Sequence, residues 1–265
     1  MVSEMDIGLM VRGERIPSSG KGQMILRSRR ACSFLFGTRT VTITNRDGVV
    51  SPASIIADCF ELPPAEAATI REGIFATGSY SVTLGNPIVL TLIKGGVSDV
   101  GSCLSEISRF LAARQMSVST ALLLSLGRAN EPPGLEGWMA RKQARILGGG
   151  LGLQDLAKGL LGLGYGLTPS GDDFIEGVIL ANEVLGSSSE AIRPQLEAYE
   201  NAFSRTTLLD ALDGQYALPI KRLGDALGGH GDLRQAAIGL GSYGSTSGTD
   251  VLAGVWYALD RAAKS

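Results

Sequence analysis

Hydrophobic and polar residues alternate in the first part of the chain. The stretch RTVTITNRDGVV, residues 39–50, alternates β-branched with polar residues around an Asn-Arg-Asp-Gly turn. The stretch SYSVTLGNPIVLTLIKG, residues 79–95, contains two similar runs separated by Gly-Asn-Pro. A period of two residues is typical of strands with one buried face. We therefore predict strands over residues 22–100, interrupted in LPPAEAATIREGIF, residues 62–75, by a turn and one short helix.

The period changes to that of a helix from residue 103 onward. In CLSEISRFLAARQ, residues 103–115, the apolar side chains Leu104, Ile107 and Leu111 fall on one helical face. GWMARKQARIL and LQDLAKGLLGL continue in this style, with glycine-rich connections. The pattern predicts an α+β protein: a β-rich domain over residues 1–100, which could close into a barrel, and an all-α domain over residues 101–265.

The helical part contains an internal repeat. Residues 152–181 align without a gap with residues 229–258, at a constant offset of 250 − 173 = 77 positions. Twelve of the thirty aligned positions are identical, and each copy has the pattern of helix, glycine-rich loop and helix. Both copies carry the sequence Ser-Gly-x-Asp, followed four residues after the Asp by Gly and eight residues after it by Ala. The repeat predicts two helix–loop–helix units of similar structure.

Capping and packing follow from the repeated positions. Asp155 and Asp232 would cap the first helix of each copy. Ser170 and Ser247 would cap the second helix, with an Asp at the third helical position as in a capping box. The small residues on one face of each second helix would allow close approach. We expect the two copies to pack about a pseudo-two-fold axis, with the starts of their second helices close together.

The charge balance excludes several classes of partner. The formal net charge is −2 with a sequence pI of about 5.6, and no block of like charges occurs. We therefore expect no nucleic-acid or membrane partner. No apolar run approaches the roughly 18 residues of a membrane helix, and the opening segment lacks the pattern of a secretory signal. We expect a cytoplasmic protein.

Histidine and cysteine are scarce, which limits the possible chemistry. His230 is the only histidine, so a site with several histidine ligands is excluded. The cysteines Cys32, Cys59 and Cys103 lack the spacing of metal ligands. Catalysis would therefore depend on Asp, Glu, Ser, Thr, Arg, Lys and backbone amides.

The segment GYGLTPSGDD, residues 164–173, is the strongest candidate ligand site. A helix start offers N–H groups to an anion, and glycines let a ligand approach the backbone. The adjacent carboxylates Asp172 and Asp173 would repel an anion, however. Either a Mg²⁺ ion bridges them, or Asp173 caps the helix while Asp172 accepts a hydrogen bond from a substrate N–H group. The sequence leaves both open, and Asp250 would be a third metal ligand.

A second candidate is FSRTTLLDAL, residues 203–212, where Arg205, Thr206 and Thr207 could bind phosphate or carboxylate. The alternative is an ordinary helix start with Arg205 in solvent. We take Asp172, Asp173 and Arg205 as candidate catalytic residues. The candidate substrate-binding residues are Gly166, Thr168, Ser170, Gly171, Thr206, Thr207, Ser247, Gly248 and Asp250.

The segment G-x-G-L-T-P-S-G-D-D before an apolar helix resembles the hallmark of the AllH-type subunit of oxamate carbamoyltransferase. The β-rich first half, the segment near Thr206 and the later Ser-Gly-x-Asp segment are also similar to that family. The resemblance implies an enzyme subunit of anaerobic allantoin (purine) breakdown. It would transfer a carbamoyl group from oxalurate to phosphate, giving oxamate and carbamoyl phosphate, together with two further protein subunits.

The residues are compatible with this reaction. Its substrates are small anions that carry amide groups. If phosphate attacks the carbamoyl carbon directly, the protein has to supply positioning and charge stabilisation, not a nucleophile. Two other functions stay open at this point. One is a non-catalytic binding or scaffold subunit, and the other is a metal-dependent hydrolase of amides or N-glycosides.

Overall fold

The computed structural model describes residues 5–6, 8–59, 66–93, 95–97, 99–112 and 118–264. The chain divides into two compact units, which we describe separately. The first unit comprises Met1–Thr91 with Gln215–Leu218, and the second comprises Leu92–Gly214 with Pro219–Ser265. The domain division expected at residue 100 stays a prediction.

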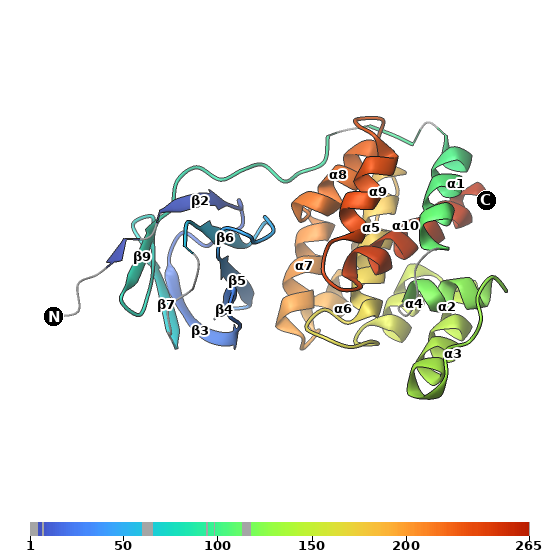
Figure 1. Ribbon diagram of the computed structural model, residues 1–265, viewed down its shortest axis with the longest axis horizontal. Coiled ribbons are helices and arrows are strands. Elements are labelled where there is room, and N and C mark those ends of the chain that lie inside the picture. Colours follow the sequence, from blue (N-terminus) through green and yellow to red (C-terminus); the bar gives the residue numbers. More distant parts are fainter. Residues whose placement is uncertain are drawn as a thin grey trace. The chain divides into compact units, whose positions relative to one another are not determined.

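The first unit contains one sheet, with nine strands among the described residues (Figure 1). The strands are β1 (Met5–Asp6), β2 (Leu9–Arg12), β3 (Gly20–Arg27), β4 (Ala31–Phe36), β5 (Arg39–Thr44), β6 (Ser54–Ala57), β7 (Ala67–Arg71), β8 (Ile74–Thr77) and β9 (Tyr80–Thr83). Their order in the sheet is β1-β9-β8-β7-β3-β4-β5-β6-β2. The pairs β1–β9 and β5–β6 are parallel, and the remaining pairs are antiparallel.

The strand order shows that the sheet curls almost into a barrel. The two edge strands, β1 and β2, follow each other in the sequence, with only two residues between Asp6 and Leu9. Opposite edges of the sheet must therefore lie close together, as in a barrel. Inside, Phe34 and Phe75 pack edge to face at a centroid distance of 5.8 Å. The predicted β-rich, barrel-like first half is thus confirmed.

The short helix predicted in residues 62–75 is wrong for the part that the structure describes. Residues 67–71 form β7, and Ile74 begins β8. Ala68 and Ile70 are buried while their neighbours are not, which is the period of a strand. The alanine-rich sequence favours a helix locally, but pairing with β3 and β8 prevails. Residues 62–65 lie outside the described residues.

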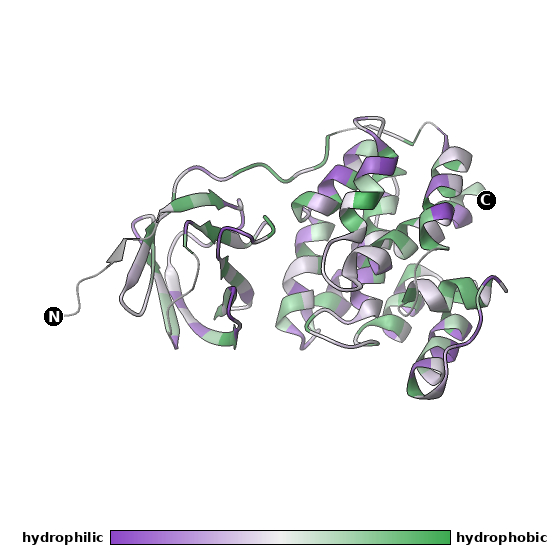
Figure 2. Cartoon of the chain, viewed as in Figure 1, coloured by the Kyte–Doolittle hydropathy of each residue, from purple (hydrophilic) through white to green (hydrophobic). Residues whose placement is uncertain are grey.

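The second unit is helical. Its helices are α1 (Val100–Leu111), α2 (Val118–Ser125), α3 (Gly134–Gly148), α4 (Leu153–Leu160), α5 (Ser170–Val184), η1 (Glu190–Ile192), α6 (Arg193–Glu197), α7 (Ala202–Leu212), α8 (Leu218–Leu227), α9 (Leu233–Gly241) and α10 (Ser247–Ala263). Helices α5 and α10 have apolar residues on most sides and are buried, and α10 is largely green in Figure 2. The predicted α+β class is confirmed. No helix among the described residues is long and apolar enough to cross a membrane.

Helices α5 and α10 are the second helices of the two repeat copies, and they cross with their backbones in contact. A Cβ atom added to Gly177 on α5 would overlap the carbonyl oxygen of Val251 on α10. A Cβ atom added to Gly254 on α10 would overlap the carbonyl oxygen of Phe174 on α5. These two contacts exchange under the 77-residue offset of the repeat. The predicted pseudo-two-fold packing of the copies is therefore confirmed.

The crossing leads to a prediction about stability. We expect Gly177→Ala or Gly254→Ala to lower the free energy of unfolding by about 3 kcal/mol, because the methyl group would meet a rigid backbone. Gly239→Ala on α9 is the matched control, since nothing lies within 4 Å of its added Cβ. It should raise stability by about 0.5 kcal/mol through helix propensity. Urea unfolding curves measure all three variants, and equal effects would contradict the close crossing.

Candidate functional site

The starts of α5 and α10 differ in detail from the predicted capping boxes. Ser170 and Ser247 are the first residues of their helices, not N-caps, and the N-cap positions hold Pro169 and Thr246. Neither N-cap residue makes a side-chain capping hydrogen bond. Asp172, not Asp173, consequently occupies the third helical position. The prediction of serine caps was therefore wrong by one residue.

The other two predicted caps have different outcomes. Asp232 accepts a hydrogen bond from the backbone N–H of Gln235 at 3.0 Å and caps α9, as predicted. Asp155 does not cap α4, because the helix already begins at Leu153 after Gly152. Asp155 lies in the first turn, where its charge interacts favourably with the helix dipole.

Loop carbonyls take up most of the N–H groups that the two helix starts would offer to an anion. The second and third N–H groups of each helix donate to the backbone just before it. The bonds run from Gly171 to Leu163 (2.8 Å), from Asp172 to Pro169 (2.8 Å), from Gly248 to Tyr243 (3.0 Å) and from Thr249 to Thr246 (2.9 Å). This tight return of the chain requires glycine at position 164, where φ is +134° and a Cβ would overlap the N atom of Ser170. The predicted anion site at these helix starts is weakened accordingly.

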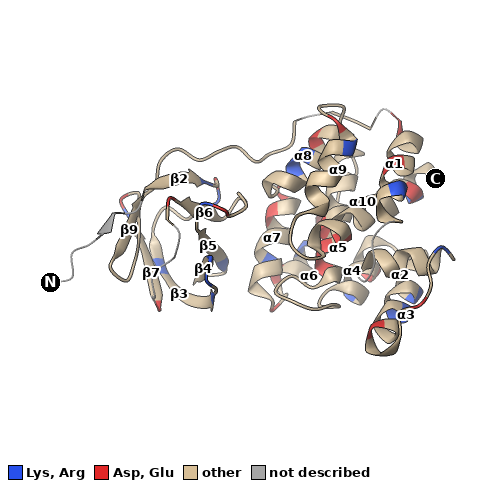
Figure 3. Cartoon of the chain, in the orientation of Figure 1, with Lys and Arg blue, Asp and Glu red and all other residues tan. Residues whose placement is uncertain are grey.

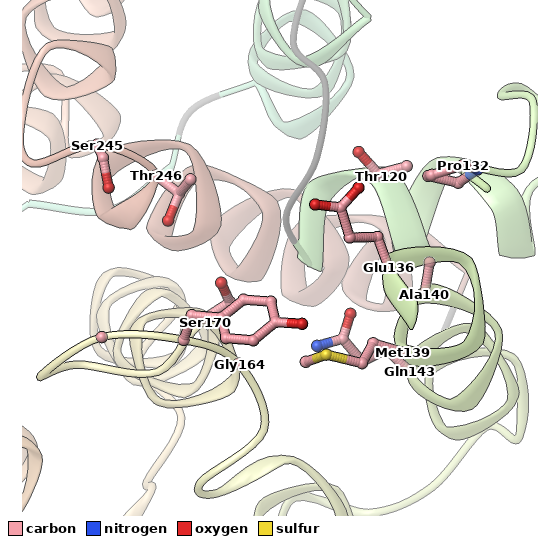
Figure 4. Close-up of a pocket in the computed structure, with 12 residues that line it drawn as sticks. Thr120, Pro132, Glu136, Met139, Ala140, Gln143, Gly164, Ser170, Ser245 and Thr246 are labelled. Atoms are coloured by element: carbon pink, nitrogen blue, oxygen red, sulfur yellow. The ribbon is translucent and has the colours of Figure 1, made fainter. Parts of the chain in front are cut away.

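A cavity of about 240 Å³ lies beside the two helix starts. Its lining combines both repeat copies with α2 and α3. The lining residues are Thr120, Pro132, Glu136, Met139, Ala140, Gln143, Gly164, Tyr165, Gly166, Ser170, Ser245 and Thr246. In Figure 4, Glu136 and Gln143 on α3 face Ser170, Ser245 and Thr246 across the cavity. We take this cavity as the candidate ligand site.

Two of the predicted substrate-binding residues, Gly166 and Ser170, line the cavity. Thr168 and Ser247 are not among the residues that line the cavity. Their hydroxyl oxygens lie 3.4 Å from each other. This contact joins the loop before α5, in the first repeat copy, to the first residue of α10, in the second copy. Gly171 and Gly248 are buried, and because they have no side chain the carbonyl oxygens of Leu160 on α4 and Leu240 on α9 pack against the helix starts.

Asp172 is buried and supports the loop before α5. Its Oδ1 accepts a hydrogen bond from the N–H of Gly162 at 2.8 Å, and its Oδ2 accepts one from the hydroxyl of Tyr199 at 2.8 Å. Burial raises the pKa of Asp172, while hydrogen bonds, including these two, lower it. Both carboxylate oxygens therefore serve the fold, and Asp172 is not among the residues that line the cavity.

Asp173 is buried between the two helix starts. Burial raises its pKa to about 8, although hydrogen bonding to the hydroxyls of Ser247 and Thr168 acts in the opposite direction. The carboxylates of Asp250 and Asp172 raise it further. Oδ2 of Asp173 is buried without a hydrogen-bond partner. Asp173 is therefore largely protonated at neutral pH.

Further acidic residues lie on the same helices, and Figure 3 shows red segments on α5. Glu176 is buried one turn further along α5, and burial followed by repulsion from Asp173 and Asp210 raises its pKa well above the usual range. Asp250 on α10 is fully buried and accepts a hydrogen bond from the N–H of Ser119 at 3.3 Å. The interior of this unit thus holds a group of carboxyl side chains, and burial favours the neutral form of Asp173 and Glu176.

The candidate residues of α7 lie elsewhere than in the cavity lining. Nη1 of Arg205 donates to the backbone carbonyl of Tyr199 at 2.8 Å. The hydroxyl of Thr206 donates to the carbonyl of Ala202 at 2.9 Å, and Thr207 is half-buried on the same helix. Asn201 caps this helix by accepting from Phe203 and Ser204. The structure therefore does not bring Arg205, Thr206 or Thr207 together with Gly166 and Ser170 in one cavity.

The carboxylates do not form a metal-binding set. Within the described ranges, no group of three or more His, Cys, Asp or Glu side chains is arranged to hold a metal ion. Asp172 already uses both oxygens for hydrogen bonds, and Asp250 accepts from Ser119. The arrangement of these side chains thus gives no support to a Mg²⁺ site, and Asp172, Asp173 and Asp250 as metal ligands stay a prediction.

Sequence reasoning missed most of the cavity wall. Thr120 on α2 and Glu136 and Gln143 on α3 are far from the hallmark in the sequence. The only local signal is that Glu136 and Gln143 are seven residues apart, so both lie on one face of a helix. Ser245 and Thr246 could have been found from the repeat, because they directly precede Ser247 as Thr168 and Pro169 precede Ser170.

Comparison with known proteins gives one family match, which includes the starts of α5 and α10. Residues 160–259 match the protein family described as oxamate carbamoyltransferase subunit AllH. The expected resemblance to the AllH family is confirmed over this segment. The matched segment runs from the end of α4 to α10 and contains the hallmark loop and the Ser-Gly-x-Asp sequence of both repeat copies. No curated protein and no solved structure shows significant similarity to the chain.

The buried acid on α5 should make stability depend on pH. The pKa of Asp173, about 8 in the folded protein, lies above the ordinary value of 3.8. The folded state therefore holds a proton that the unfolded state releases, and stability falls as pH rises from about 4 to about 8. We expect Asp173→Asn to reduce this slope by about 1 kcal/mol per pH unit. Chemical unfolding at pH 5, 6, 7 and 8 measures it.

Asp155→Asn is the matched control, because it makes the same substitution at an exposed position of α4. It should leave the pH dependence as it is in the unmodified protein. A slope that is the same in the Asp173→Asn and Asp155→Asn variants would contradict a protonated Asp173.

Proposed function

We propose that the chain is a subunit of oxamate carbamoyltransferase and that the cavity beside the α5 and α10 starts binds its small substrate. One observation carries this proposal. The segment that matches the AllH family supplies one side of the cavity, from Gly164, Tyr165, Gly166, Ser170, Ser245 and Thr246. A concave site with a few convergent polar groups is the usual form of a small-molecule site.

The proposed reaction is carbamoyl transfer between oxalurate and phosphate, with oxamate and carbamoyl phosphate as products. It would serve allantoin breakdown, together with two further protein subunits. Hydroxyl groups of Ser170 and Thr246 and the side chains of Glu136 and Gln143 would orient the substrate. Holding the reacting groups in line reduces the entropic part of the barrier. No step requires a protein nucleophile, since phosphate itself attacks the carbamoyl carbon.

A substitution that narrows the cavity tests the proposal. We expect Ala140→Leu, in the buried wall formed by α3, to lower kcat/KM for phosphate-dependent oxalurate cleavage at least about tenfold, mainly through KM, in the enzyme assembled with its partner subunits. Ala262→Leu on the exposed end of α10 is the matched control and should keep the original kinetics. Unchanged kinetics for Ala140→Leu would remove this cavity from the active site.

A second candidate function is a subunit that contributes mainly a binding surface. Large apolar side chains are exposed on α3 and on the hallmark loop: Leu135, Trp138, Tyr165 and Leu167. Clustered exposed apolar residues often mark a protein interface. A loss of assembly in the double variant Trp138→Ser/Tyr165→Ser, combined with normal kinetics for Ala140→Leu, would favour this function over the first.

A further inference from the structure

We propose that the cavity binds the uncharged, hydrogen-bond-donating amide end of its ligand and leaves the anionic end outside. This inference rests on the proposed function, since it concerns the same cavity. The ligand class is that of small oxalic-acid amides, in which one end carries an –NH₂ group and the other a carboxylate. The inference says which end the chain recognises, and by which atoms.

The polar groups of the cavity can accept hydrogen bonds from an amide. The Glu136 carboxylate accepts only, and the amide oxygen of Gln143 and the hydroxyl of Ser170 accept as well. Glu136 lies on the solvent-exposed side of the lining, while Gln143 is buried. In Figure 4 the Gln143 side chain extends from α3 on the side of Ser170, and the Glu136 carboxylate lies beside Thr120. The Gln143 amide and the Ser170 hydroxyl can both donate and accept, whereas the Glu136 carboxylate accepts only. An –NH₂ group can donate to Glu136, and a carboxylate oxygen cannot.

The charges around the cavity disfavour an anion. Among the residues described as its lining, none is Lys or Arg, and Glu136 carries the only full charge. A carboxylate or phosphate in the cavity would face the Glu136 carboxylate without a Lys or Arg side chain among the lining residues to compensate, which is unfavourable in a partly desolvated site.

The helix starts do not compensate for the missing cation. An anion at a helix N-terminus is normally held by the first free backbone N–H groups. Here the second and third of these groups donate to loop carbonyls in both helices. The anionic end of the ligand therefore lies outside the cavity, in solvent or beside a basic side chain of another subunit.

Oxamate and oxalate form a matched pair of probes, because they differ only in an –NH₂ group in place of a carboxylate oxygen. We expect the full chain to bind oxamate at least about tenfold more tightly than oxalate, which corresponds to one charge-assisted hydrogen bond. Oxamide, the neutral diamide, should bind at least as tightly as oxamate. Inorganic phosphate should not compete with either. Ligand-observed NMR titrations measure these dissociation constants.

Glu136→Gln tests the assigned acceptor. It should reduce the oxamate preference about tenfold, because it removes both an acceptor for –NH₂ and the charge that repels oxalate. Glu197→Gln at the exposed end of α6 is the matched control and should keep the preference. An unchanged preference in the Glu136→Gln variant would overturn the inference.

The failures of the two proposals are distinguishable. Equal or tighter binding of oxalate, or competition by phosphate, overturns the inference and leaves the cavity as a ligand site. If none of the probes binds to the chain, the cavity is not a binding site of this subunit, and the proposed function fails together with the inference.

Discussion

The backbone contact between α5 and α10 is the constraint on which the helical unit depends. Because Gly177 and Gly254 have no side chains, each helix approaches the other until carbonyl oxygens fill the space of a Cβ atom. At such a short separation, the residues one turn closer to the helix starts are enclosed as well. Asp173 and Asp250 each lie four residues before these glycines, and both are buried. The close crossing thus explains the unusual burial of acidic side chains in the first turns.

Buried carboxyl groups and an anion site are hard to combine at the same helix starts. A carboxylate in a first turn interacts favourably with the helix dipole and competes for it with any anionic ligand. In this protein the chain's own carbonyl and carboxyl groups occupy the helix starts. Loop carbonyls occupy the N–H groups, and burial keeps Asp173 protonated near neutral pH, with its pKa at about 8. The helix starts therefore provide a rigid, hydrogen-bonded wall for the neighbouring cavity.

Much of the fold could be predicted from the sequence, because the period of hydrophobic residues and the repeat are local signals. The alternation in residues 39–50 and the 77-residue offset led to the barrel-like sheet and to the crossing of α5 and α10. The strand β7 was missed, since its partners β3 and β8 decide its conformation.

Only part of the candidate site could be predicted. Gly166 and Ser170 were found through the hallmark, but Arg205 was grouped with them only because phosphate was the expected ligand. The wall from α2 and α3 depends on tertiary packing, and the spacing of Glu136 and Gln143 on one helical face does not say which element that face contacts. Asp172 was assigned a ligand role because two adjacent carboxylates suggested a metal ion or a substrate N–H donor, although its two oxygens accept from Gly162 and Tyr199.

The divergence between the two repeat copies has a structural explanation. Where the first copy has Asp172, the second has Thr249, which is buried and has no carboxylate to hold a distant loop. Asp172 ties Gly162, at the beginning of the hallmark loop, and Tyr199, just before α7, to the start of α5. The loop that lines the cavity is therefore fixed at both ends, by this carboxylate and by the return of the chain at Gly164. Asp172 acts on the site through the loop that it positions, and the extra carboxylate of the hallmark is explained without a metal ion.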